Sequence, residues 1–119
     1  MPDSIRTVVW LGNSRKNMRE FPNKVRCDMG AALFAAQCGA TAEYVKPFKG
    51  VGSGVFEIVE RYSKDAYRLV YAVQIGERLY VLHAFQKKSK SGIATPKQDV
   101  DLIKQRYKEA QEHAKNDPH

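Results

Sequence analysis

The sequence has few cysteines and no long hydrophobic run, and both absences exclude classes of protein. Cys27 and Cys38 are expected on one helix, about 16 Å apart, which is too far for a disulfide bond. Neither has a histidine or cysteine neighbour at zinc-ligand spacing, so both are interpreted as small buried hydrophobes. The longest apolar stretch, residues 29–38, is shorter than the roughly 20 residues that span a bilayer. A disulfide scaffold and a transmembrane helix are therefore not expected.

The residue patterns of common hydrolases are also missing. Histidines occur only at positions 83, 113 and 119, and no two of them have the spacing of metal ligands. Glu57 and Glu60 are expected on opposite faces of one strand, so they do not form a catalytic carboxylate pair. No serine–histidine–acid arrangement is recognisable. We therefore expect neither a metal nor a cofactor.

Charge and length limit the partners and the size of the fold. The 119 residues are expected to form one domain, residues 1–119, with a single modest core. The formal net charge of +7 favours an anionic partner, such as nucleic acid, an acidic protein or an anionic membrane surface. A basic surface that only aids solubility is the alternative. The first residues lack the pattern of a secretory signal, so we expect a cytoplasmic protein without membrane contact.

The order of predicted elements indicates an α+β fold. Strands are expected where β-branched and aromatic residues gather, and helices where apolar residues recur every three or four positions. The strands are predicted at 5–11, 55–62, 67–75 and 79–86, and the helices at 14–21, 22–38 and from Thr95 onward. Thr95-Pro96-Lys97-Gln98 is a helix start with a hydroxyl N-cap. We predict a small antiparallel sheet, an N-terminal strand plus a three-stranded meander, with the helices on one face.

The middle strand of the meander carries one charge in an otherwise apolar alternation. Its odd positions from Tyr67 to Ile75 are predicted to form a continuous apolar face, and Arg68 lies on the other, mixed face. His83 is expected in the next strand with Val81 and Phe85 on its own face. Basic residues cluster in and beside the meander at Lys46, Lys49, Arg61, Arg68, Lys87 and Lys88. This distribution is typical of a binding site for an anion.

The glycine-rich segment at residues 50–54 has two interpretations. Its glycines let backbone amides approach a phosphate closely, but the spacing is not that of a nucleotide-binding P-loop. We interpret the segment as a flexible turn.

Two segments resemble a known family. Tyr67-Arg68-Leu69-Val70-Tyr71 and His83-Ala84-Phe85-Gln86-Lys87-Lys88-Ser89 are similar to the phage-derived HigB branch of the RelE/ParE toxin superfamily. The similarity extends from the loop at residues 46–50 to the C-terminal helix. It implies a RelE-like fold and the toxin of a type II toxin–antitoxin system. It also implies a ribosome-dependent mRNA endonuclease that needs no metal, because the ribose 2′-hydroxyl attacks the adjacent phosphate. The implied partners are an antitoxin of helix-turn-helix type, the ribosome and mRNA.

The resemblance also implies roles for particular residues. Arg68 matches the family's strand arginine and is expected to stabilise the reacting phosphate. Lys87 and His83 are candidates for the acid or base, although a histidine in this position is also a common core residue. Lys46, Lys49, Arg61 and Lys88 are expected to bind flanking phosphates, and Tyr71 or Phe85 to stack on a base unless they belong to the core.

One departure from the family leaves the general base open. Some members have a catalytic tyrosine near the C-terminus, whereas Tyr107 lies too deep in the last helix to match it. Two other functions are compatible with the sequence. One is a ParE-like toxin that poisons DNA gyrase. The other is a phage-derived module that binds nucleic acid or protein without catalysis.

Overall fold

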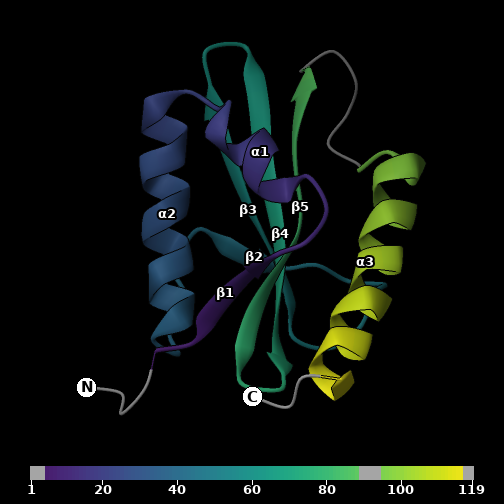
Figure 1. Cartoon of the computed structure of the whole chain (residues 1–119). Coiled ribbons are helices and arrows are strands. Elements are labelled where there is room, and N and C mark those ends of the chain that lie inside the picture. The colour runs from purple at the N-terminus through teal and green to yellow at the C-terminus, as the bar shows by residue number, and fades with distance from the viewer. Residues whose placement is uncertain (1–4, 89–94, 117–119) are drawn as a thin grey trace.

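The computed structural model describes residues 5–88 and 95–116 and confirms an α+β fold (Figure 1). The elements are β1 (Thr7–Trp10), α1 (Ser14–Arg19), α2 (Asn23–Gln37), β2 (Val45–Pro47), β3 (Val55–Tyr62), β4 (Asp65–Ile75), β5 (Arg78–Lys88) and α3 (Lys97–Asn116). The predicted order of elements is correct, with the short strand β2 added. None of the helices in the described part of the chain is both long and apolar enough to cross a bilayer.

The sheet is mixed, so the prediction of a wholly antiparallel sheet is wrong at its N-terminal strand. The strand order is β1-β5-β4-β3-β2, and β1 pairs with β5 in parallel while the other pairs are antiparallel. Antiparallel hairpins follow from tight turns, but β1 reaches β5 through a connection that contains two helices and three strands. Such a long connection permits either direction of pairing.

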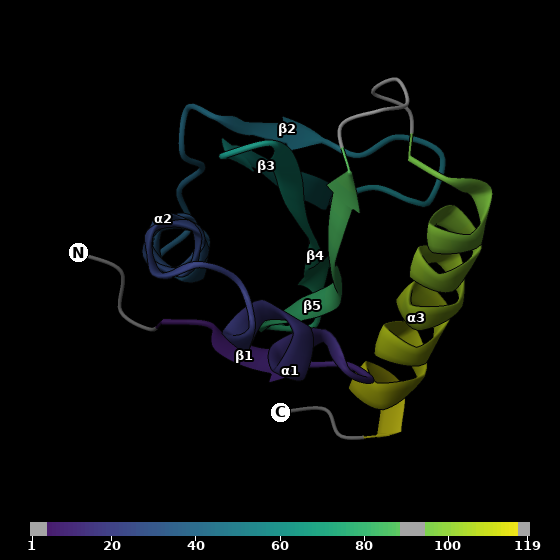
Figure 2. The same ribbon diagram turned by 90° about the horizontal axis from the view of Figure 1, so that it is seen from above.

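Helices cover both faces of the sheet, so the prediction that they share one face is also wrong. α1 and α2 lie on one side and α3 on the other (Figure 2). The reason is that β4 is apolar on both faces: Tyr67, Leu69 and Tyr71 pack with α2, while Val70 and Ala72 belong to the cluster that includes α3. A central strand buried on both faces needs a layer on each side.

The buried face of α2 is as predicted, but its cysteines are not in the core. Val25, Met29, Ala32, Leu33 and Ala36 are buried at helical spacing. Cys27 is exposed and Cys38 is partly exposed, because both lie off that buried stripe, and both thiols are free.

Candidate functional site

The register of the strands brings four of the predicted site residues, Lys46, Arg68, His83 and Phe85, to the face of the sheet that α3 covers. Residues directly opposite each other on neighbouring strands share a face. One row across β2–β5 is Lys46, Glu57, Val70 and His83; the next is Val59, Arg68 and Phe85. Thr95, two residues before α3, and Asp99, in its first turn, reach these rows. We call this end of the face the β4–β5 site.

Arg68 lies at the centre of the β4–β5 site and is held there by a carboxylate. It is only 7% exposed. Its Nη1 atom is 3.2 Å from Oε1 of Glu57 and donates a longer hydrogen bond, 3.4 Å, to the hydroxyl of Thr95. The pair with Glu57 fixes the guanidinium, because a buried cation needs a charged partner close by. From the sequence, Glu57 was considered only as half of a catalytic carboxylate pair, and its role beside Arg68 was missed. The register shows this role, because Glu57 lies two residues from Val59, the direct cross-strand partner of Arg68.

His83 faces α3 because β5 contains an irregularity in its pairing. Val70 pairs with His83 but Tyr71 pairs with Val81, so Leu82 is an extra residue in β5. Such a bulge reverses the alternation of side chains on one side of it. Val81 therefore packs in the α2-side cluster and Phe85 in the α3-side cluster. The bulge explains why the prediction that Val81 shares a face with His83 is wrong. The prediction that Phe85 shares that face is confirmed.

A similar irregularity changes the end of β4. The register shifts between Ala72 and Ile75, and Gln74 has a positive φ of 71°. Ile75 consequently packs in the α3-side cluster instead of continuing the apolar face of Tyr67, as the alternation predicted. The continuous odd-numbered face therefore ends before Ile75.

The ring of His83 is fixed by Asp99 and Phe85. Its Nε2 atom is 2.8 Å from Oδ1 of Asp99, and its ring stacks on that of Phe85 with centroids 4.6 Å apart at 17°. Burial lowers the pKa of His83, whereas the hydrogen bond and charge of Asp99 raise it and the charge of Arg106 lowers it further. The net direction is downward, which favours the neutral imidazole, and a neutral ring can donate from Nε2 to the carboxylate.

Arg106 connects α3 to the bulge. Its Nη1 atom donates to the carbonyl oxygen of Leu82 at 2.9 Å, and its Nη2 atom donates to Oδ1 of Asn13 at 2.9 Å. Gly12, at a φ of +53°, lies directly under the guanidinium, where a Cβ atom would collide with it. Burial lowers the pKa of Arg106 from its ordinary value. Arg106 therefore stabilises the local geometry that turns His83 toward α3.

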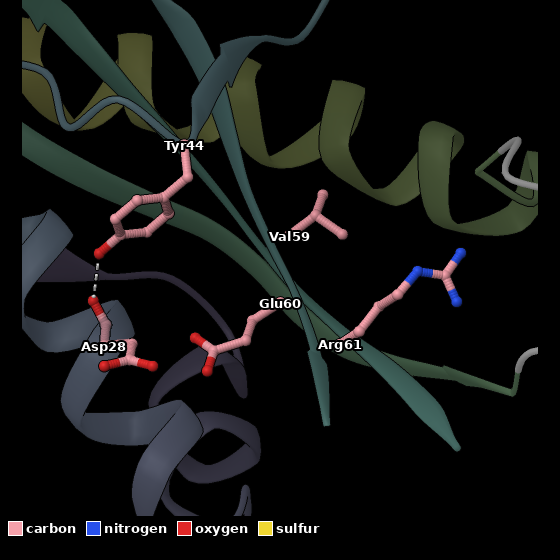
Figure 3. Close-up of a pocket in the computed structure, with 5 residues that line it drawn as sticks. All are labelled: Asp28, Tyr44, Val59, Glu60 and Arg61. Atoms are coloured by element: carbon pink, nitrogen blue, oxygen red, sulfur yellow. Dashed lines mark hydrogen bonds between the residues drawn. The ribbon is translucent and has the colours of Figure 1, made fainter. Parts of the chain in front are cut away.

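The other predicted basic residues surround the β4–β5 site at the surface. Lys46, Lys49 and Arg61 are exposed, and Lys46 is the cross-strand partner of Glu57. Arg61 borders a pocket of about 390 Å³ with Asp28, Tyr44, Val59 and Glu60, and it extends away from the two carboxylates (Figure 3). The backbone of β5 ends with Lys87 and Lys88, with Lys87 opposite Ala66. The side chains of Lys87 and Lys88 lie outside the described part of the structure.

Tyr71 is not brought to the β4–β5 site. It is 1% exposed on the opposite face, where its ring stacks on Phe56 with centroids 5.7 Å apart, and burial raises its pKa to about 12. The core interpretation therefore describes Tyr71. Phe85 is half-buried on the same face as Arg68, its cross-strand partner.

The remaining features of the sequence have structural positions. The hydroxyl of Tyr107 donates to the carbonyl oxygen of Ser53 at 3.5 Å, and its ring covers Gly52, so the glycine-rich segment packs against α3. Among residues 5–88 and 95–116, no three histidine, cysteine or acidic side chains gather as metal ligands.

The fold and the β4–β5 site define a small basic α+β protein with a carboxylate-held arginine and a histidine–aspartate pair on one sheet face. The profile of a family described as phage-derived Gp49-like proteins (DUF891) matches residues 16–108. The chain belongs to this family, which confirms the phage-derived relationship predicted from the two segments in β4 and β5.

Comparison with solved structures gives a further similarity. A chain in the crystal structure of the toxin–antitoxin complex RelBE2 from Mycobacterium tuberculosis is 17% identical, with a TM-score of 0.47. The alignment covers 74% of this chain and 97% of that chain. No curated protein matches the sequence.

Proposed function

We propose that this protein is the toxin of a type II toxin–antitoxin system and acts as a metal-independent, ribosome-dependent mRNA endonuclease in the cytoplasm. The observation that carries the proposal is the buried pair of Arg68 and Glu57 on a sheet face that also presents His83. A buried, prepositioned guanidinium can stabilise charge as it develops on a phosphate. The resemblance of β4 and β5 to the HigB branch supports RNA as the target.

The chemistry requires three groups besides the RNA. A base removes the proton of the ribose 2′-hydroxyl, the O2′–P bond forms as the P–O5′ bond breaks, and an acid protonates the leaving O5′. The products are a 2′,3′-cyclic phosphate and a 5′-hydroxyl end. Arg68 supplies the cation that stabilises the pentacoordinate phosphate, an interaction whose loss typically costs about 10²–10³-fold in rate. Glu57 positions this cation. Lys87 and His83 were both predicted as candidates for the acid or the base, and we assign His83 to the base and Lys87 to the acid.

The surroundings of the β4–β5 site suit single-stranded RNA. Lys46 and Arg61 are exposed cations on the strands β2 and β3, Lys49 is exposed just after β2, and Lys88 follows at the end of β5. Single-stranded RNA binding combines such cations with aromatic rings on which bases stack. Phe85 offers that ring: one of its faces stacks on His83, and a base would stack on the other.

The net charge of +7 also bears on the partners. The ribosome and mRNA are polyanions, and electrostatic steering increases the rate at which oppositely charged partners meet. We propose that an antitoxin, of helix-turn-helix type, presents an acidic segment to this basic face. Complementary charge gives such a complex its specificity.

The test is inducible expression in bacteria with the 5′ ends of cellular messages mapped by primer extension. Wild type is compared with Arg68→Ala and Arg68→Lys, because loss of the buried charge could reduce folding and lysine retains it. Arg15→Ala, an exposed arginine on α1 away from the β4–β5 site, is the matched control. We expect wild type and the control to arrest growth and cut messages in frame, and both Arg68 variants to do neither. Circular dichroism of the purified variants verifies folding.

The same experiment separates the alternatives. Growth arrest with intact messages would assign the protein to the gyrase-poisoning class. Normal growth with intact messages would identify a non-catalytic binding module. Cutting by folded Arg68→Ala at the wild-type rate would remove Arg68 from the site.

A further inference from the structure

The buried imidazole of His83 has one nitrogen without a hydrogen-bond partner. His83 is 5% exposed, and its Nδ1 atom is buried and finds no partner among the described residues. Leaving a buried polar atom unpaired costs about 1–3 kcal/mol, so such atoms are rare in folded proteins and require an explanation. Nε2 of the same ring is paired, 2.8 Å from Oδ1 of Asp99.

The partner of the other nitrogen determines the state of Nδ1. A carboxylate only accepts hydrogen bonds, so Asp99 requires the hydrogen on Nε2. In the neutral ring Nδ1 then carries the free lone pair. Asp99 thus fixes both the tautomer and the orientation of the ring, as a buried carboxylate does for the histidine of a catalytic triad. The nitrogen that is left unpaired is the basic one.

The fold maintains this arrangement from three sides. The extra residue Leu82 turns His83 toward α3, and Arg106 binds the carbonyl oxygen of Leu82 at 2.9 Å. Phe85 stacks on one face of the ring. Asp99 and Arg106 lie two turns apart on α3, so one helix fixes both the ring and the bulge that carries it.

We infer that Asp99 is the positioning residue of the proposed nuclease and that Nδ1 of His83 is the atom that accepts the 2′-hydroxyl proton. This inference rests on the proposed function. In the step, the proton leaves O2′ for Nδ1 directly or through one water molecule, while O2′ bonds to phosphorus and the P–O5′ bond breaks. The acid returns a proton to O5′, and the imidazolium later releases its own to solvent. Asp99 stabilises the imidazolium through the hydrogen bond to Nε2.

A purely structural role for the pair makes different predictions. If Asp99 only ties α3 to the sheet, its loss should lower stability and leave the pH dependence of cleavage unchanged. If Asp99 positions a base, its loss should also lower the pKa of His83, because Asp99 raises that pKa. The other charged groups around His83 are Arg106 on α3 and, across β4, Arg68 and Glu57. All of these remain in an Asp99 variant.

The experiment measures single-turnover cleavage of a defined mRNA on purified 70S ribosomes over a range of pH. Asp99→Asn is compared with Asp101→Asn, which removes the same charge from the same helix. Asp101 is exposed and pairs only at 3.5 Å with exposed Lys97. We expect Asp99→Asn to lose about 10²–10⁴-fold in rate and to move the acid limb of the profile to lower pH. Asp101→Asn should stay within about twofold of wild type, and Asp99→Glu should recover part of the loss.

A second measurement needs no variant. Nitrogen-15 NMR of the imidazole in the wild-type protein should show the hydrogen on Nε2 and none on Nδ1 at neutral pH. The opposite tautomer would overturn the inference. So would an Asp99→Asn protein that cuts like Asp101→Asn, or one that loses activity with an unmoved acid limb.

Failure of the inference is distinguishable from failure of the proposed function. If wild type cuts and Asp99→Asn matches its control, only the role of Asp99 falls. If wild type cuts no RNA on programmed ribosomes, the proposed nuclease function is refuted. The proton-transfer role of His83 is then refuted as well, even if the NMR spectrum shows the expected tautomer.

Discussion

Replacing Arg106 with methionine should destabilise the protein strongly, because its guanidinium is buried between α3 and the sheet. The guanidinium donates to Leu82 and Asn13 and is 8% exposed. Methionine retains much of the hydrophobic stem but donates no hydrogen bond. The substitution therefore isolates the two polar contacts that connect α3 to the bulge in β5 and to the start of α1.

The expected loss follows from those two contacts. A hydrogen bond from a charged donor is worth about 1.5–3 kcal/mol, and a buried carbonyl left unpaired costs about 1–3 kcal/mol. Removing the guanidinium also ends the desolvation cost of a buried charge, which offsets part of this loss. We expect the free energy of unfolding to fall by about 2–4 kcal/mol. The carbonyl of Leu82 dominates this figure, because an extra residue in a strand has no ladder partner of its own.

Urea denaturation followed by circular dichroism measures the effect, with Lys104→Met as the control. Lys104 is exposed on the same helix, so its replacement should change the free energy of unfolding by less than about 0.5 kcal/mol. The Arg106 variant should also cut mRNA more slowly while folded, since the bulge orients His83. A loss no larger than that of the control would show that α3 does not hold the bulge.

Three further predictions follow from the same region. Gly12→Ala should lower the free energy of unfolding by about 1–3 kcal/mol, because the added Cβ collides with the guanidinium of Arg106. The loss should be clearly smaller in the Arg106→Met background, and a double-mutant cycle measured by urea denaturation tests this coupling. The pKa of His83 is lowered in the folded protein, so the unfolded chain binds more protons below about pH 6.5. Stability should thus be complete above that pH and decline toward pH 5, and the decline should be smaller in His83→Gln; an unchanged slope would contradict the lowered pKa. Lys46→Ala and Arg61→Ala should each reduce the slope of log affinity against log salt for a labelled single-stranded RNA by about 0.7, and an unchanged slope would place that residue away from the RNA.

The sequence was sufficient to predict the elements because their signals are local. The alternation in β4 depends on neighbouring residues alone and is found as predicted up to the register shift before Ile75. The start of α3 is also a local signal, but the helix begins at Lys97, one residue later than predicted, and the hydroxyl of Thr95 accepts a hydrogen bond from Arg68. Arg68 was identified for the same reason, as the single charge in an apolar strand. The layers on both faces were not predicted, although Val70 and Ala72 already made the second face of β4 apolar. That face was predicted to be mixed because it contains Arg68, although its neighbours Val70 and Ala72 are apolar.

The site was harder to predict because its partners meet through non-local pairing. Glu57 reaches Arg68 only through the register of β3 and β4. The face of His83 depends on the bulge at Leu82, and a strict alternation of period two cannot reveal an inserted residue. No local signal marks Leu82, because it is as apolar as the strand residues around it. His83 therefore stays a predicted site residue, while its neighbour Val81 was assigned to the wrong face.

The sequence of α3 contains a pattern that predicts which of its residues contact the sheet. Residues 99, 103, 106, 110 and 113 follow each other at alternating spacings of four and three, which is the spacing of a single helix face. Three of these five residues are polar, and each bonds to β5: Asp99 to His83, Arg106 to the carbonyl oxygen of Leu82, and His113 to Tyr80. Polar residues on a buried stripe are costly unless they are paired, so their presence there indicates specific partners. The same stripe that anchors α3 to the sheet therefore carries the residue that orients His83, which explains why stability and the proposed catalysis should respond together to changes along it.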